Sequence, residues 1–179
     1  MYTTEQLNKF TEILTEGGVA AAPAEGVYGY CCDALNPKAL QKVVELKQRT
    51  PEKGFVVLIG DLKQLDDLCE GLTCQQHEMM DLHWPGQVTL VLPVKKGLPE
   101  LLTGGFDTIA VRFPKPDYMR QYLKAWGKPM VSTSANISGE PPIYEQQFLP
   151  TTIYALPTVQ KLEGSVSKLI DATTGQQYR

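Results

Sequence analysis

No stretch of this sequence is apolar for long enough to cross a membrane. None of its uninterrupted apolar runs approaches the ~18 residues that a membrane-spanning helix requires. The first residues, Met1 to Glu5, also lack the cationic start and the apolar segment of an export signal. We therefore expect a protein without membrane segments that is located in the cytoplasm.

Neither sign of charge is in large excess. The 17 basic and 20 acidic side chains leave a formal net charge of -3. A general nucleic-acid-binding surface relies on neutralising phosphates and usually belongs to a basic domain, so this balance argues against one while leaving room for a local basic patch. A hydrophobic content of 42% and a charged content of 21% are typical of globular proteins. Wholesale disorder, a collagen repeat and a coiled coil are therefore excluded.

Cysteine and histidine are scarce. Two of the four cysteines, Cys31 and Cys32, are adjacent, which is a poor layout for a disulfide framework and agrees with a reducing compartment. The other two stand near both histidines, but the spacing of this set matches no common zinc-binding motif: Cys69, Cys74, His77 and His83. We therefore expect free thiols and no structural metal ion.

Two common catalytic motifs are missing as well. The sequence has no glycine-rich Walker loop, which argues against conventional P-loop chemistry. It has no Gly-x-Ser-x-Gly turn, which weakens a hydrolase interpretation.

Segments typical of strands and helices alternate along the chain. Thr3 and Gln6 have the spacing of a capping box, and the helix that they predict ends at Gly17. Asn36 followed by Pro37 predicts the cap and first turn of a second helix. Three more helices are expected near residues 62–68, 73–83 and 117–126, and strands over 19–22, 55–59, 88–92, 109–111 and 130–131. This alternation predicts one α/β domain over residues 1–179, with a mixed sheet flanked by helices.

Four polar segments stand beside the ends of expected core strands, where open α/β sheets bind their ligands. They are Pro23–Glu25, the cation-rich segment Lys47–Lys53, Arg112, and the serine-rich segment Ser132–Asn136.

The cation-rich segment concentrates Lys47, Arg49 and Lys53 in the expected loop after a helix. Arginine and lysine together suit a polyphosphate, although cations at a helix end also complement the helix dipole. The serine-rich segment is equally ambiguous. Its hydroxyls and the backbone N–H groups of an expected helix start would suit an oxyanion or phosphate, yet Ser, Thr and Asn also dominate ordinary caps and turns. A lone Arg112 is more often a surface or salt-bridge residue, so spacing alone leaves the function open.

Six motifs in register resemble the YrdC family, the threonylcarbamoyl-AMP synthases that begin the N6-threonylcarbamoyl modification of adenosine 37 in tRNA. The resemblance covers nearly the whole chain. The motifs are Pro-Ala-Glu-Gly-Val-Tyr-Gly at 23–29, Lys-x-Arg at 47–49, Trp-Pro-Gly-Gln-Val-Thr at 84–89, Ala-Val-Arg at 110–112, Ser-Thr-Ser-Ala-Asn at 132–136 and Ser-Gly-x-Pro-Pro at 138–142.

The resemblance implies a twisted α/β domain around a deep, positively lined cavity. It also implies an activity in which L-threonine, bicarbonate and ATP give threonylcarbamoyl-AMP and pyrophosphate, with Mg²⁺ accompanying the ATP. Further partners would be tRNA and the proteins that transfer the threonylcarbamoyl group to it. The chain is long enough for the synthase domain but not for the additional carboxy-terminal domain of longer relatives.

The resemblance assigns roles to individual residues, and no covalent protein nucleophile is needed. Lys47 and Arg49 are expected to be catalytic. The expected ATP-binding residues are Arg49, Lys53, Thr108, Ser134, Asn136 and Arg179, and the expected threonine-binding residues are Ala24, Arg112, Ser132 and Ser167.

One position departs from the family pattern. The family usually has Pro-Thr-Glu where this chain has Pro-Ala-Glu, so Ala24 replaces a threonine of the amino-acid pocket. Three alternatives follow: a weakened synthase, a paralogue with another amino-acid specificity, or a noncatalytic module of the same fold that binds double-stranded RNA or tRNA.

Overall fold

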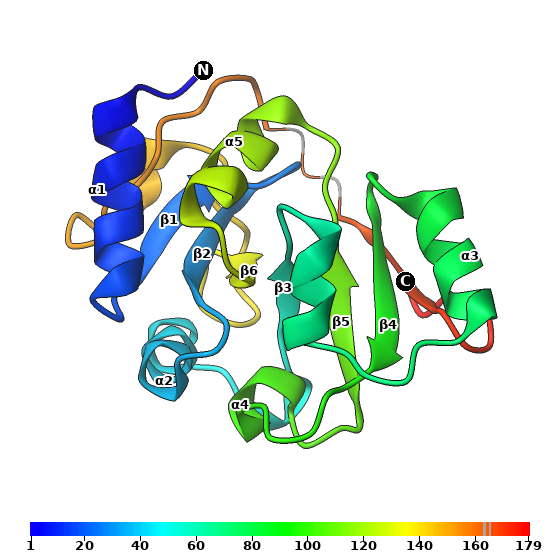
Figure 1. Ribbon diagram of the computed structural model, residues 1–179. Coiled ribbons are helices and arrows are strands. Elements are labelled where there is room, and N and C mark those ends of the chain that lie inside the picture. Colours follow the sequence, from blue (N-terminus) through cyan, green and yellow to red (C-terminus); the bar gives the residue numbers. More distant parts are fainter. Residues whose placement is uncertain (163, 165) are drawn as a thin grey trace.

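A computed structural model describes residues 1–162, 164 and 166–179. Within these residues the chain forms one seven-stranded mixed sheet in the order β1-β2-β6-β3-β5-β4-β7 (Figure 1). The strands are β1 (Ala20–Pro23), β2 (Tyr28–Asp33), β3 (Val56–Leu58), β4 (Val88–Pro93), β5 (Thr108–Arg112), β6 (Met130–Ser134) and β7 (Lys168–Asp171). The β3/β5 and β4/β7 pairs are parallel and the other pairs are antiparallel.

Helices cover both faces of this sheet. The α-helices are α1 (Thr4–Thr15), α2 (Pro37–Lys47), α3 (Cys74–His83), α4 (Glu100–Thr103) and α5 (Asp117–Trp126), and 3₁₀ helices lie at η1 (Pro51–Lys53), η2 (Leu62–Asp67) and η3 (Gln146–Phe148). Buried residues of α1 and α5 belong to one hydrophobic cluster, whereas those of α2, α3 and α4 belong to another. The predicted α/β fold with a mixed sheet flanked by helices is therefore confirmed.

Neighbouring residues of the central strands join different clusters. Val57 and Val131 pack with α2 and α4, whereas Leu58 and Met130 pack with α1 and α5. Because successive side chains of a strand point to opposite faces, the two clusters must lie on opposite sides of the sheet. Each residue of β3, β5 and β6 is therefore assigned to one of the two faces of the sheet, and the side chains on each face follow from that assignment.

The expected helix caps are present. Thr3 Oγ1 accepts a hydrogen bond from the Gln6 backbone N–H, and the Gln6 side chain accepts one from the Thr3 backbone N–H, which completes the predicted capping box. Asn36 Oδ1 accepts hydrogen bonds from the backbone N–H groups of Lys38 and Ala39, at 3.0 and 3.3 Å. Both caps fix where a helix begins, and the second one orients the helix that ends at Lys47.

Several elements differ from the prediction. Residues 62–67 form a 3₁₀ helix, because only a short segment separates Gly60 from the bridge between Cys69 and Val94. The strand β6 continues through Ser134, beyond the predicted end at Val131. The strand β2, the short helix α4 and the strand β7 were not predicted. The strand β2 is almost fully buried, so its sequence shows no alternation of apolar and polar residues.

The described part of the chain contains no helix that is long and apolar enough to span a bilayer.

We expect removal of the α2 cap to destabilise the protein. Asn36→Ala deletes the oxygen that accepts two backbone N–H groups, and the free energy of unfolding in urea should fall by about 1 kcal/mol. Asn8→Ala is the matched control, because Asn8 is exposed inside α1, where alanine has the higher helix propensity. Equal losses in the two variants would contradict a capping role for Asn36.

Candidate active site

A cavity of about 620 Å³ lies on the face of the sheet that carries α5. The sheet forms the floor of this cavity. Because side chains alternate along a strand, Thr108, Ala110 and Arg112 of β5 point to the same side and line it. Ser132 and Ser134 of β6 line the same cavity. Such a volume is within the range of small-molecule sites. The depth of this cavity, which the resemblance to the YrdC family implied, stays a prediction.

Gly29 of β2 lets the cavity floor pack closely. It pairs with Ser134 across the β2/β6 ladder. A Cβ atom at position 29 would stand 2.7 Å from Ser132 Oγ, closer than a real Cβ contact allows. A larger residue there would require the Ser132 hydroxyl to move, so the final glycine of the Pro-Ala-Glu-Gly-Val-Tyr-Gly motif leaves that hydroxyl its place.

The charged side chains that line the cavity are mainly positive. Its cationic side chains are Arg49, Lys53, Arg112 and Arg179, and Glu25 is the one acidic side chain among its described lining residues. Arg112 is buried, whereas Lys53 and Arg179 are exposed. The lining therefore presents exposed cations at its edge and a buried cation inside, which suits an anionic ligand.

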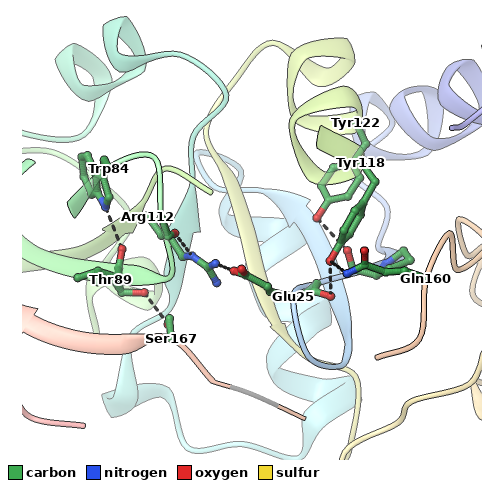
Figure 2. A network of polar contacts seen from close by, with 12 residues as sticks. Glu25, Trp84, Thr89, Arg112, Tyr118, Tyr122, Gln160 and Ser167 are labelled. Atoms are coloured by element: carbon green, nitrogen blue, oxygen red, sulfur yellow. Dashed lines mark hydrogen bonds and ion pairs between the residues drawn. The ribbon is translucent and has the colours of Figure 1, made fainter. Parts of the chain in front are cut away.

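Arg112 and Glu25 form an ion pair inside this cavity. Arg112 Nη2 contacts Glu25 Oε2, and Arg112 Nε donates to the Gly86 carbonyl at 3.0 Å (Figure 2). Burial lowers the pKa of Arg112 below its ordinary value, while Tyr122 and Tyr118 act in the opposite direction. The bond to Gly86 holds the guanidinium in one orientation, so its Nη groups point toward Glu25.

Two tyrosines of α5 hold the segment that precedes Glu25. Tyr122 Oη donates to the Pro23 carbonyl and Tyr118 Oη to the Ala24 carbonyl, each at 3.2 Å (Figure 2). Burial raises the pKa of both phenols, so they remain protonated donors. The backbone at Ala24 is thereby fixed against α5, and the Glu25 side chain projects from an anchored segment.

Arg49 is held at the edge of the cavity. Its Nη2 donates to the Gly54 carbonyl, and its guanidinium lies 4.7 Å from the centroid of the Phe55 ring. Burial lowers the pKa of Arg49 from its ordinary value. Contact with an aromatic ring and a backbone carbonyl orients the planar guanidinium before any ligand binds.

Lys47 does not lie in a loop, as the sequence suggested, because it is the last residue of α2 and its side chain is buried. Its Nζ donates to the carbonyls of Ser134 and Asn136 at 2.5 and 2.9 Å, and lies 3.3 Å from Asn136 Oδ1. Burial, aided by the nearby charge of Arg49, lowers the pKa of Lys47 to about 8. Lys47 therefore ties the end of α2 to the end of β6.

The helix start expected after the serine-rich segment is also wrong. Ser132, Thr133 and Ser134 belong to β6 itself, and the next described helix is η3. Beyond the strand, Asn136 Nδ2 donates to the carbonyls of Ile137 and Glu140, which closes a turn. Pairing of Ser132–Ser134 with β2 supplies the order that a helix was expected to give, and the cavity receives hydroxyls rather than a helix N-terminus.

The end of the chain lies along β7 and reaches the cavity. Arg179 Nε donates to the Ser167 carbonyl at 3.2 Å, and the Leu169 N–H donates to the Arg179 carbonyl at 3.1 Å. The Ser167 hydroxyl lies 2.8 Å from the Thr89 hydroxyl of β4 (Figure 2). These contacts bring Ser167 and Arg179 to the same cavity as β5 and β6.

The structure gathers most of the predicted site residues but not all of them. Those that line the cavity are Ala24, Arg49, Lys53, Thr108, Arg112, Ser132, Ser134, Ser167 and Arg179. Lys47 and Asn136 do not line it and instead support the end of β6.

The sequence patterns gave no site role to Phe55, Thr89, Tyr118 or Tyr122, and they marked Glu25 only as part of the polar segment Pro23–Glu25. Glu25 and Thr89 belong to two of the quoted motifs, and that is the signal that could have found them. The tyrosines carried no such signal, because their place near the cavity depends on how α5 packs on the sheet.

No metal-binding cluster is preformed in the parts of the chain that the structure describes. No group of three or more His, Cys, Asp or Glu side chains there could hold a metal ion.

A mixed sheet with a polar, cation-lined cavity on one face defines the chain as an α/β ligand-binding domain. Comparison with known sequences places it more narrowly: the chain belongs to the Sua5/YciO/YrdC family, described as telomere recombination, whose pattern matches residues 12–172. A threonylcarbamoyl-AMP synthase of Idiomarina loihiensis is 40% identical over 160 residues, covering 88% of this chain and 81% of the relative. The enzyme of that name from Nitrosococcus oceani is 34% identical over 172 residues, covering 93% of each chain.

Solved structures show the same fold. P. abyssi Sua5 complexed with L-threonine matches with a TM-score of 0.89 at 27% identity, over 99% of this chain and 54% of that protein. The chain thus spans about half the length of Sua5. E. coli YciO matches with a TM-score of 0.80 at 22% identity, over 96% of this chain and 85% of YciO, which shows a shared fold.

We expect burial of Lys47 to make stability depend on pH. The amine loses its proton near pH 8 when folded and near its ordinary value of 10.5 when unfolded. Between these values the unfolded chain binds more protons, so this group makes the free energy of unfolding rise with pH. Relative to Lys47→Met, the wild type should gain about 1 to 2 kcal/mol between pH 7 and pH 9.5 in urea unfolding.

Lys38→Met is the control, since Lys38 is exposed at the other end of α2. The difference in free energy of unfolding between Lys38→Met and the wild type should stay nearly constant with pH. A constant difference for Lys47→Met as well would show that Lys47 keeps its charge in the folded protein.

Proposed function

We propose that this chain is a threonylcarbamoyl-AMP synthase that uses L-threonine, bicarbonate and ATP and supplies the N6-threonylcarbamoyladenosine modification of tRNA. The observation that carries the proposal is one cavity holding a buried arginine, several further cations and a row of hydroxyls. The two synthases described above support it by their similarity over most of the chain, and Sua5 with bound L-threonine supports it by its fold.

The amino acid occupies the inner part of the cavity. Arg112 binds its carboxylate, because a guanidinium forms paired hydrogen bonds to two oxygens and this one is already oriented by Gly86. Ser132 and Ser167 are placed to bind the polar groups of the substrate, and the methyl group of Ala24 lines the pocket where the family usually has a hydroxyl.

ATP occupies the outer part, where Arg49, Lys53 and Arg179 neutralise its phosphates. Thr108 and Ser134 offer hydroxyls to the nucleotide. Asn136 contributes to the ATP subsite indirectly, because its contact with Lys47 helps to hold the end of β6 in place. Exposed apolar side chains at the cavity, Phe106, Val166 and Tyr178, provide a surface for the base.

The chemistry requires charge neutralisation and exclusion of water rather than a protein nucleophile. The threonine amine captures carbon dioxide derived from bicarbonate, with loss of water, to form a carbamate. A carbamate oxygen then attacks the α-phosphorus, and pyrophosphate leaves. Arg49 is the catalytic cation that meets the charge developing on the phosphates. Lys47 acts through Ser134 and Asn136 and is a positioning residue in this geometry.

Mg²⁺ is proposed to enter with ATP. This ion prefers oxygen ligands, keeps several waters and is usually bound by substrate phosphates with one or two carboxylates. Here the ATP phosphates would supply most of its ligands, and the hydroxyls of Thr108 and Ser134, which line the same cavity, are the protein oxygens that would hold it. When bound, Mg²⁺ neutralises charge on the phosphates.

We further propose that residues 1–179 form one domain with this activity. Its product is a mixed anhydride of a carbamate and a phosphate, which reacts readily with nucleophiles. Proteins that transfer the threonylcarbamoyl group to tRNA are therefore the expected downstream partners, and a cytoplasmic location stays a prediction.

The proposal is tested by measuring pyrophosphate released from ATP with bicarbonate and single amino acids. We expect release that depends on ATP, bicarbonate and threonine together. The Idiomarina loihiensis relative serves as the positive control. No release above background with threonine, while the relative works under the same conditions, would contradict the proposed function.

We expect Ala24→Thr to bind threonine as well as the wild type or more tightly. The added hydroxyl can donate one uncharged hydrogen bond to the substrate, which corresponds to about 0.5 to 1.5 kcal/mol, or roughly two- to twelvefold in affinity. Calorimetry gives the dissociation constant, and Ala24→Val is the control for added volume without a hydroxyl. A large loss of affinity in Ala24→Thr would show that the pocket is built around alanine.

A further inference from the structure

Glu25 is unusual among the residues of the cavity. It is the one acidic side chain among the described lining residues, and it forms an ion pair with the most buried cation of that lining, Arg112. The Glu25 side chain is 22% exposed and that of Arg112 is 7% exposed. Glu25 is therefore the more accessible member of the pair, although its Oε2 atom is itself buried against Arg112.

An α-amino acid carries the same two charges as this pair. Its carboxylate matches Arg112 and its ammonium group matches Glu25, and both the pair and the zwitterion are neutral overall. A ligand that inserts between the two side chains replaces one ion pair with two. A ligand with only a carboxylate would bind Arg112 while leaving Glu25 beside it without a partner, and unpaired charges in such surroundings are strongly disfavoured.

We propose that Glu25 binds the α-ammonium group of the amino-acid substrate, and that the substrate opens the Glu25–Arg112 pair when it binds. The inference rests on the proposed function for the presence of an amino acid in this cavity. It adds a specificity-determining residue, because Glu25 makes the site select an amino acid over the same carboxylic acid without its amino group.

The anchoring of the surrounding chain supports this assignment. Tyr122 and Tyr118 hold the carbonyls of Pro23 and Ala24 (Figure 2). The Ala24 N–H donates to the Val27 carbonyl at 2.8 Å. Arg112 is held through Nε by Gly86. Both backbones are thus fixed, and the pair can open by rotation of the Glu25 side chain while the ligand supplies a new partner to each charge.

The ammonium position also matters for the reaction. The nitrogen that Glu25 would bind is the atom that must react with carbon dioxide. It reacts after the ammonium group has lost a proton, for which the Glu25 carboxylate is the adjacent acceptor. Fixing the carboxylate on Arg112 and the nitrogen on Glu25 leaves one orientation for the side chain of the amino acid. Glu25 is therefore a residue that orients the reacting nitrogen.

The experiment compares pairs of ligands that differ only in the amine. Calorimetry without ATP measures dissociation constants for L-threonine and 3-hydroxybutanoate, which is threonine without its amino group, on the wild type and on Glu25→Gln. In the wild type, threonine should bind more tightly. In Glu25→Gln, threonine affinity should fall by ~10- to 150-fold, as expected for loss of a charge-assisted hydrogen bond, while 3-hydroxybutanoate should bind as well as before or better.

Controls separate this effect from a loss of structure. ATP affinity should be unchanged in Glu25→Gln, and Glu78→Gln, which neutralises an exposed carboxylate on α3, should leave both ligand affinities unchanged. If Glu25→Gln fails to fold, Glu25→Asp keeps the charge with a shorter reach and should reduce the preference for threonine only partly. Serine with 3-hydroxypropanoate and alanine with propanoate extend the comparison to other amino acids.

An unchanged ratio of the two dissociation constants in Glu25→Gln, with the wild type still releasing pyrophosphate in the presence of threonine, would overturn the role of Glu25 and leave the proposed function standing. A wild type that binds none of the amino acids and releases no pyrophosphate would overturn the proposed function and this assignment with it.

Discussion

The arrangement of the site depends on keeping one arginine charged at the edge of a hydrophobic core. Arg112 is the last residue of β5, and its strand neighbours Ile109 and Val111 belong to the core on the other face. A buried guanidinium needs partners, and this one has the Gly86 carbonyl and the Glu25 carboxylate. Those partners come from the β1–β2 turn and from the segment before β4. The need to pair one charge therefore draws three distant parts of the sequence together.

Successive side chains of a strand point to opposite faces of the sheet, so one short strand contributes to both the hydrophobic core and the cavity. In β5, the side chains of Ile109 and Val111 belong to the core on one face, whereas those of Thr108, Ala110 and Arg112 point to the other face and line the cavity, which Ile109 also touches. A shift of one residue in register would exchange these faces and bury the hydroxyl and the guanidinium among apolar side chains. Pairing of β5 with both β3 and β4 holds the register. The stability of the core and the composition of the cavity are thus set by the same ladders.

The sequence predicted the parts of this architecture that are encoded locally. The caps at Thr3 and Asn36 and the α/β order followed from short-range patterns, and these were confirmed. The strand β2 escaped prediction because a strand buried on both faces has no alternation. The buried position of Lys47 also depends on contacts between residues that are far apart, here α2 with the end of β6. The six motifs predicted which residues share one site, but they could not show that Glu25 contacts Arg112.

The uneven distribution of charge favours a small anionic ligand over a polyanion. The whole chain carries a net charge of -3, while the described lining of the cavity has several cations and a single carboxylate. The side chains outside the cavity are therefore negative on balance. Such a surface repels the extended phosphate backbone of a nucleic acid, whereas a cavity with low-dielectric walls concentrates its positive potential on a ligand that fits inside. A nucleotide can reach these cations individually, but a double helix is too wide to enter a space of about 620 Å³. Charge placement thus argues for a nucleotide-using enzyme and against a module that binds RNA through the same cavity.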